Sequence, residues 1–127
     1  MYGLILVVFI GGALGAMVRE CLMLLIPTLS SGFPLDIFIA NIIASFLLGY
    51  ATYHHRLKNI SDDMILLFGA GTLGGMSTFS SFIYGAVSEF NQPGKEWISI
   101  TYVISSLIIG FLACWFGLYM SEPQKQL

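Results

Sequence analysis

The sequence predicts an all-α membrane protein with four transmembrane helices. Of its 127 residues, 57% are hydrophobic and 9% are charged, whereas an ordinary soluble domain has roughly 25% charged residues. The apolar residues fall into four runs of roughly 20 to 25 residues, the length that a helix needs to cross a bilayer. Turn-forming and charged residues gather between these runs. Four spans use nearly all of the chain, so we expect one transmembrane domain, residues 1–127, in the plasma (inner) membrane.

Each span ends where turn residues or charges begin. The spans are predicted at about residues 2–26, 35–53, 64–90 and 97–120. They are followed by "PTLSSGFP", "HHRLKNISDD", "NQPGKE" and "SEPQKQL", stretches typical of turns and aqueous loops. The start of the chain has no basic segment and no small-residue cleavage site, so the first span is expected to be retained.

The few charges predict the orientation of the chain in the membrane only weakly. If both termini and the second loop share a side, that side has Arg56, Lys58 and Lys125, and the other has Lys95 and, nearby, Arg19. Under the positive-inside rule such a small difference permits insertion in both directions and an antiparallel dual-topology dimer, or one weakly favoured orientation. The net charge of −2 provides no basic surface for nucleic acid.

The first span carries glycines and one arginine on one helical face. Gly11, Gly15 and Arg19 are four residues apart, and the glycines indicate close helix packing. Arg19 either extends to the headgroups or attracts anions in a water-filled vestibule. Cys21 and Cys114 lie in apolar stretches and are interpreted as small buried residues rather than a disulfide or metal pair.

The second and fourth spans repeat this four-residue spacing. The stripes consist of Asn41, Ser45 and Gly49, and of Tyr102, Ser106 and Gly110. An asparagine inside a membrane either bonds to a neighbouring helix or contributes to a polar pathway.

The third span is predicted to break in the middle of the membrane. "FGAGTLGG" has four glycines in eight residues, and each costs about 1 kcal/mol relative to alanine in a helix. Non-helical backbone at this depth must be enclosed by protein or line water, and its free carbonyls can bind a hard monovalent cation or another chain's donors.

A hydroxyl-rich segment with two phenylalanines follows the glycines. In "STFSSF", Phe79 and Phe82 are three residues apart, with Ser77, Thr78 and Ser81 among the hydroxyls around them. Hydroxyls donate hydrogen bonds, and aromatic rings are electropositive at their edges. This combination favours contact with an anion.

The absence of certain residue types from the sequence argues against several functions. There is no catalytic constellation, so an enzyme is not expected. No Asp or Glu lies deep in a span, because Glu20, Asp36 and Glu89 are near span ends. A proton-coupled small multidrug-resistance-type exporter needs such a carboxylate. A purely structural membrane subunit does not need polar stripes on three helices. Both remain alternatives to an ion pathway.

The segment "GTLGGMSTFSSF" resembles the signature of the Fluc (CrcB) family of fluoride channels. "FIGGALGAMVR", "ANIIASFLLG" and "IIGFLACWFG" are also similar to that family, so the resemblance covers nearly the whole chain. It implies a passive, fluoride-selective channel that exports fluoride down its electrochemical gradient and lowers its toxicity. It also implies an antiparallel dimer with two pores, formed with a second copy or with a paralogous subunit.

The resemblance also implies residue roles. Phe79 and Phe82 match the pore phenylalanines, Asn41 the fluoride-coordinating asparagine, Arg19 the vestibule arginine, and Tyr102 and Ser106 a polar track with Thr78 and Ser81 as hydroxyl neighbours. The backbone carbonyls of Gly74 and Ser77 match those that hold a structural sodium ion at the dimer centre. The chain departs from the pattern at Gly85, where many members have Glu, and at Ser77, where Thr is common.

Overall fold

The computed structural model describes residues 2–122, and within them the chain consists of helices and loops. The elements are α1 (Tyr2–Leu25), α2 (Leu35–Arg56), α3 (Asp62–Ile65), η1 (Leu66–Leu73, a π-helix), α4 (Gly74–Met76), α5 (Phe79–Phe90) and α6 (Glu96–Ser121). The third span, Asp62–Phe90, comprises α3 to α5, and it and the three long helices are long and apolar enough to cross a membrane. The predicted all-α membrane fold is confirmed. Lys125, which entered the orientation argument, lies outside the described residues.

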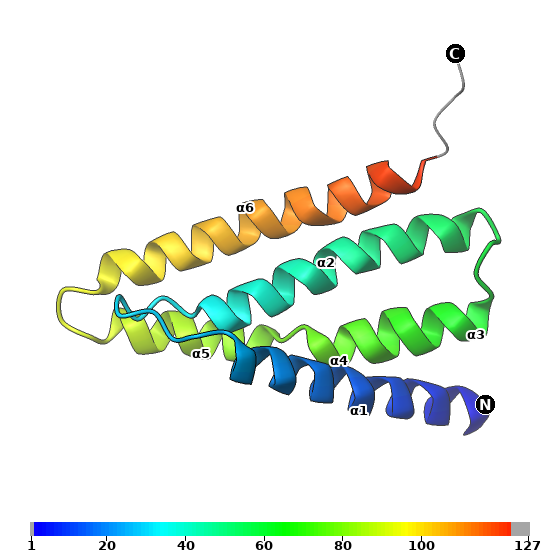
Figure 1. Ribbon diagram of the computed structural model, residues 1–127, viewed down its shortest axis with the longest axis horizontal. Coiled ribbons are helices and arrows are strands. Elements are labelled where there is room, and N and C mark those ends of the chain that lie inside the picture. The colour runs from blue at the N-terminus through cyan, green and yellow to red at the C-terminus, as the bar shows by residue number, and fades with distance from the viewer. Residues whose placement is uncertain (1, 123–127) are drawn as a thin grey trace, which may run out of the picture.

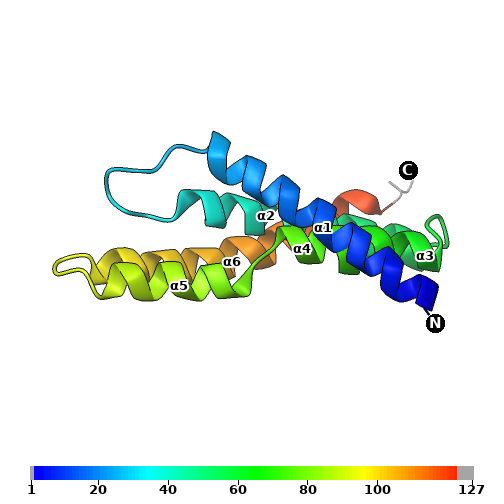
Figure 2. The ribbon, with the colours of Figure 1, turned by 90° about the horizontal axis from the view of Figure 1, so that it is seen from below.

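The helices form two neighbouring pairs. Helix α2 runs beside α6, and α1 packs against η1 and α4 (Figure 1). The α1–α2 and α5–α6 loops lie at one end of the molecule, and the α2–α3 loop lies at the other (Figure 1). Helix α1 crosses the third span near its middle, at α4 (Figure 2). The break in the third span therefore lies at the centre of the molecule.

The glycines of α1 allow its backbone to touch the third span. A Cβ atom at Gly11 would collide with the carbonyl oxygen of Leu67, and one at Gly15 with that of Thr72. Any side chain here would push the two helices apart. The close packing expected from the glycine spacing is confirmed.

Helices α2 and α6 approach each other in the same way. A Cβ atom at Gly49 would collide with the carbonyl oxygen of Cys114, and one at Gly117 with that of Phe46. At one end of this pair the Ser121 hydroxyl donates to the Tyr50 carbonyl at 3.3 Å. The pair therefore forms a tight unit.

Both cysteines are free. Cys114 is half-buried, but Cys21 is exposed on the isolated chain. The prediction that Cys21 is buried is wrong, because its part of α1 faces away from the other helices and toward lipid or a partner.

The break in the third span follows the glycines instead of falling among them. Residues 66–73 form a π-helix and 74–76 remain helical, after which the chain is extended at Ser77 (ψ 151°) and Thr78 (φ −149°). The expectation of a break within "FGAGTLGG" is therefore wrong in position. The glycines there serve packing, since Gly71 would meet the Gly11 Cα at 3.0 Å if it carried a Cβ.

Candidate functional site

Asn41 of α2 binds the backbone at the break. The Thr78 N–H donates to Asn41 Oδ1 at 2.7 Å, and Asn41 Nδ2 donates to the Thr78 carbonyl at 3.3 Å. The amide thus satisfies both backbone groups of Thr78, as a peptide unit would. Of the two interpretations of Asn41, the structure shows the bond to a neighbouring helix. One N–H of its amino group is left over for another acceptor.

The Thr78 side chain caps the N-terminus of α5. Its Oγ1 accepts the Ser81 N–H at 3.1 Å, an N-cap, and donates to Ser81 Oγ at 3.0 Å. Thr78 is buried and Ser81 half-buried. The two hydroxyls predicted to be neighbours of the pathway are therefore brought together, and in this structure they bond to each other.

The two phenylalanines begin α5 but lie in different surroundings. Their ring centroids are 6.0 Å apart. Phe82 is 9% exposed and packs on the Tyr102 ring at 5.3 Å, whereas Phe79 is 76% exposed on the isolated chain. Phe82 thus lies inside one chain, and Phe79 faces lipid or a second subunit.

Two hydroxyls of α6 are buried and lack hydrogen-bond partners within residues 2–122. They are Tyr102 OH and Ser106 Oγ, one helical turn apart, and Tyr102 is 0% exposed. An unpaired buried polar group costs about 1–3 kcal/mol, so such groups normally have a partner, protein or otherwise. The Tyr102 ring lies beside Phe82, and the two hydroxyls provide donors for a small polar species.

Backbone carbonyls are also free at the break. Ser77 N–H makes the last helical bond, to the Leu73 carbonyl at 2.9 Å. In the described part of the chain the carbonyls of Gly74 and Ser77 accept no hydrogen bond. A half-open cavity of about 100 Å³ is lined by both residues, with Ala44, Ser45, Leu48, Gly69 and Leu73. Free carbonyls beside a cavity suit a hard cation.

Arg19 reaches the break from α1. Its Nη1 donates to the Gly75 carbonyl at 3.3 Å, and the residue is half-buried. The guanidinium thus places its positive charge at the C-terminal end of the half-helix, where the helix dipole favours a cation. The role of Arg19 at a vestibule stays a prediction.

Sequence reasoning missed one buried charge. Glu89, assigned only to a span end, is 8% exposed, with Lys95 Nζ at 3.7 Å from its Oε2. It lies seven residues after Phe82, on the same helical face, and that spacing could have revealed its burial.

Comparison with known proteins agrees with this architecture. Residues 6–118 match the family model described as "CrcB-like protein, Camphor Resistance (CrcB)". A protein of Yersinia pseudotuberculosis named "Fluoride-specific ion channel FluC 3" is 49% identical over 98% of this chain and 93% of its own length.

Two further relatives carry similar names. "Fluoride-specific ion channel FluC 1" of Brucella abortus is 44% identical over the whole of this chain, which spans 47% of that longer protein. "Fluoride-specific ion channel FluC" of Chlorobium phaeobacteroides is 30% identical over 95% of this chain and 94% of its own length. The chain is a multi-pass membrane protein that belongs to the CrcB family.

Proposed function

We propose that this protein is a fluoride-selective ion channel and not an enzyme. One observation carries the proposal: within residues 2–122 the buried hydroxyls of Tyr102 and Ser106 on α6 have no hydrogen-bond partner, and the Tyr102 ring packs on the Phe82 ring. Fluoride is small and strongly hydrated, so a pathway must replace its water with closely spaced donors. The family membership and the names of the relatives support this assignment.

The pathway would follow α5 and α6. The remaining N–H of Asn41 and the hydroxyls of Tyr102 and Ser106 would donate to the anion, while Phe79 and Phe82 present their ring edges. The hydroxyls of Thr78 and Ser81 lie next to these rings and could turn from each other toward the ion. Arg19 would attract anions to the mouth of the pathway.

A second subunit would complete the site. Phe79 is exposed and the cavity beside Gly74 is half-open, so a single chain leaves the region of the break uncovered. We propose an antiparallel, dual-topology pair, with a second copy or with a paralogous subunit. The carbonyls of Gly74 and Ser77 from both subunits would hold a structural sodium ion, whose charge would fix the two broken helices together.

Transport would be passive. Hydrofluoric acid crosses membranes and ionises in a near-neutral cytoplasm, and a negative-inside potential then drives fluoride out with about 2.3 kcal/mol per charge per 100 mV. Residues 2–122 have no carboxylate in the middle of a span, since Glu89 is in the last turn of α5. A proton-coupled exporter would need one.

Liposomes test the proposal. Purified protein should release trapped fluoride, followed with a fluoride electrode, and retain chloride. Phe79→Ile and Phe82→Ile should each lower fluoride release by roughly tenfold or more, because they remove the ring edges. Phe111→Ile is the matched control, since Phe111 is on α6 and is not among the residues proposed for the pathway. The proposal fails if wild-type protein releases no fluoride, and unchanged release in both variants removes the phenylalanines from the pathway.

A further inference from the structure

The α1–α2 loop covers the end of the α5–α6 pathway. Its residues Gly32, Phe33 and Pro34 are here called the strap. They contact, respectively, the side chains of Glu89 and Lys95, the Tyr102 ring, and Gly85. The Phe33 ring packs edge-on against the Tyr102 ring at 5.3 Å. Pro34 lies so close to Gly85 that a Cβ there would be 3.1 Å from Pro34 Cγ. The strap thus closes over Tyr102, which is 0% exposed.

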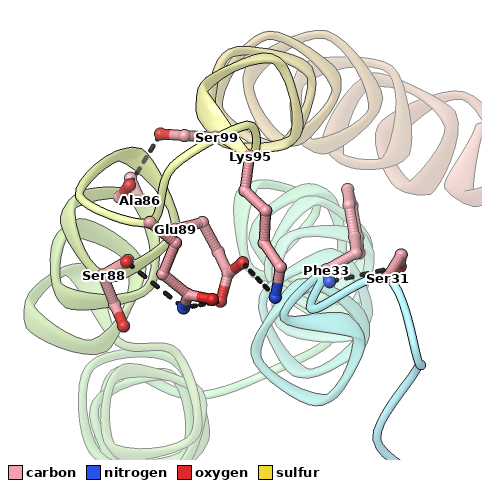
Figure 3. A network of polar contacts seen from close by, with 8 residues as sticks. Ser31, Phe33, Ala86, Ser88, Glu89, Lys95 and Ser99 are labelled. Atoms are coloured by element: carbon pink, nitrogen blue, oxygen red, sulfur yellow. Dashed lines mark hydrogen bonds and ion pairs between the residues drawn. The ribbon is translucent and has the colours of Figure 1, made fainter.

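The strap ends against an ion pair between the buried Glu89 and the partly exposed Lys95. Glu89 Oε1 accepts a hydrogen bond from Gln92 Nε2 at 3.3 Å, and Glu89 Oε2 faces Lys95 Nζ at 3.7 Å (Figure 3). Oε2 is buried without a hydrogen bond within the described residues. A Cβ at Gly32 would lie 2.5 Å from this oxygen and 2.9 Å from Lys95 Nζ. The strap therefore rests directly on the pair.

Stability alone does not explain such a pair. Burial removes water from the Glu89 carboxylate, and an ion pair whose lysine is partly exposed contributes little net free energy to stability. Here the pair links the last turn of α5 to the start of α6, at the place where Gly32 docks. The pair thus fixes the surface on which the strap lies.

We propose that Glu89 and Lys95 are positioning residues that hold the strap over Tyr102 and so set the size of anion that the pathway accepts. This role rests on the proposed channel function. With the strap seated, Phe33 and Pro34 leave no space beside Tyr102 and Gly85. When the pair is broken the strap loosens, the end of the pathway widens, and a larger anion such as chloride enters.

Two single variants separate positioning from a simple electrostatic effect. Glu89→Gln leaves an uncompensated positive charge, and Lys95→Met leaves a negative one. If the pair acted only through its field on the anion, the two variants would change fluoride release in opposite directions. If it positions the strap, both lower the ratio of fluoride to chloride release.

The experiment measures this ratio in liposomes. We expect each single variant to lower it by roughly tenfold, the loss of discrimination typical of a pocket that becomes looser. The charge-swapped variant Glu89→Lys/Lys95→Glu should restore it, and Glu96→Gln, a change at an exposed neighbour, should leave it unchanged. The positioning role would be overturned if the two single variants changed fluoride release in opposite directions, or if they left the fluoride-to-chloride ratio unchanged. It would also be overturned if the charge-swapped variant did not restore that ratio.

Two glycine variants provide a second test if the Glu89 and Lys95 variants do not assemble. Gly32 and Gly94 both have positive φ, +91° and +81°, so alanine strains both backbones. A Cβ at Gly94 meets nothing within 4 Å, whereas one at Gly32 strikes the ion pair. Gly32→Ala should lower the ratio and Gly94→Ala should not. Equal effects overturn the inference. Absence of fluoride release from wild-type protein instead refutes the channel function itself.

Discussion

At the scale of single residues, Asn41 accounts for the helix break. In a continuous helix the Thr78 N–H would bond to the Gly74 carbonyl, four residues earlier. Asn41 Oδ1 takes this N–H instead, at 2.7 Å, and Thr78 then caps α5 with its own hydroxyl. One amide on α2 thus leaves free the carbonyl of Gly74, a residue that lines the cavity, and retains one N–H, which is the proposed donor to an anion.

Replacing Asn41 with Asp separates these two tasks. Asp keeps the acceptor for the Thr78 N–H but loses the donor to the Thr78 carbonyl and the spare N–H, and it adds a negative charge that repels anions. We expect fluoride release to fall by roughly tenfold or more, while stability falls by about 1 kcal/mol, the value of one hydrogen bond. Thermal unfolding in detergent and liposome release measure the two effects.

The matched control for Asn41→Asp is Asn59→Asp, in the exposed α2–α3 loop. It introduces the same change far from the break and should alter neither quantity. Normal fluoride release from the Asn41→Asp protein would contradict a donor role for Asn41.

At the scale of elements, the sequence predicts the spans well and the break poorly. Run lengths and turn residues locate all four spans, because the bilayer sets helix length. The break lies after the glycines because the packing of Gly11 and Gly15 on η1 offsets the helical cost of glycine, and sequence alone does not show this packing. Four-residue spacing correctly groups Tyr102 with Ser106. The helical spacing from Phe82 places Glu89 on the same face of α5, but its contact with Gly32, in a distant loop, cannot be predicted from the sequence.

The contact between α1 and the third span can be tested with two neighbouring glycines. Gly15→Ala would place its Cβ on the Thr72 carbonyl, whereas a Cβ at Gly12 would meet only the Gly71 carbonyl at 4.0 Å. Gly15→Ala should lower the free energy of unfolding by about 2 kcal/mol, because overpacking forces the backbones apart. Gly12→Ala should be neutral or stabilising, since alanine favours the helix. Denaturation in detergent compares them, and equal effects would contradict the packing.

At the scale of the whole molecule, one chain leaves the region of the helix break uncovered. Phe79 is exposed, and so is Gly74, whose carbonyl borders the half-open cavity. In contrast, Phe82 and Tyr102 are buried within the chain, and the strap residues are half-buried. The proposed pathway would therefore be built partly by one subunit and completed by a second.

Exchange of sodium tests whether that assembly uses the free carbonyls. Replacing Na⁺ in all solutions with N-methyl-D-glucamine, a cation too large for a cavity of about 100 Å³, should dissociate the pair or abolish fluoride release, because the facing carbonyls then repel each other. Size-exclusion chromatography and liposome release measure the two results, with Na⁺ restored as the control. A dimer that stays intact and active without Na⁺ would contradict the proposed ion.

The proposed antiparallel arrangement predicts that the chain inserts into the membrane in both orientations. With Cys21 and Cys114 changed to Ser, Asn59→Cys places one thiol in the exposed α2–α3 loop without altering a charge. If the slight charge bias lets the chain insert in both directions, a membrane-impermeant maleimide should label roughly half of the protein from each side. Two lysines added to this loop should move nearly all labelling to the cytoplasmic side, and they should abolish fluoride release, because the proposed pair needs opposite orientations. Labelling of the original loop from one side only would rule out the dual-topology pair.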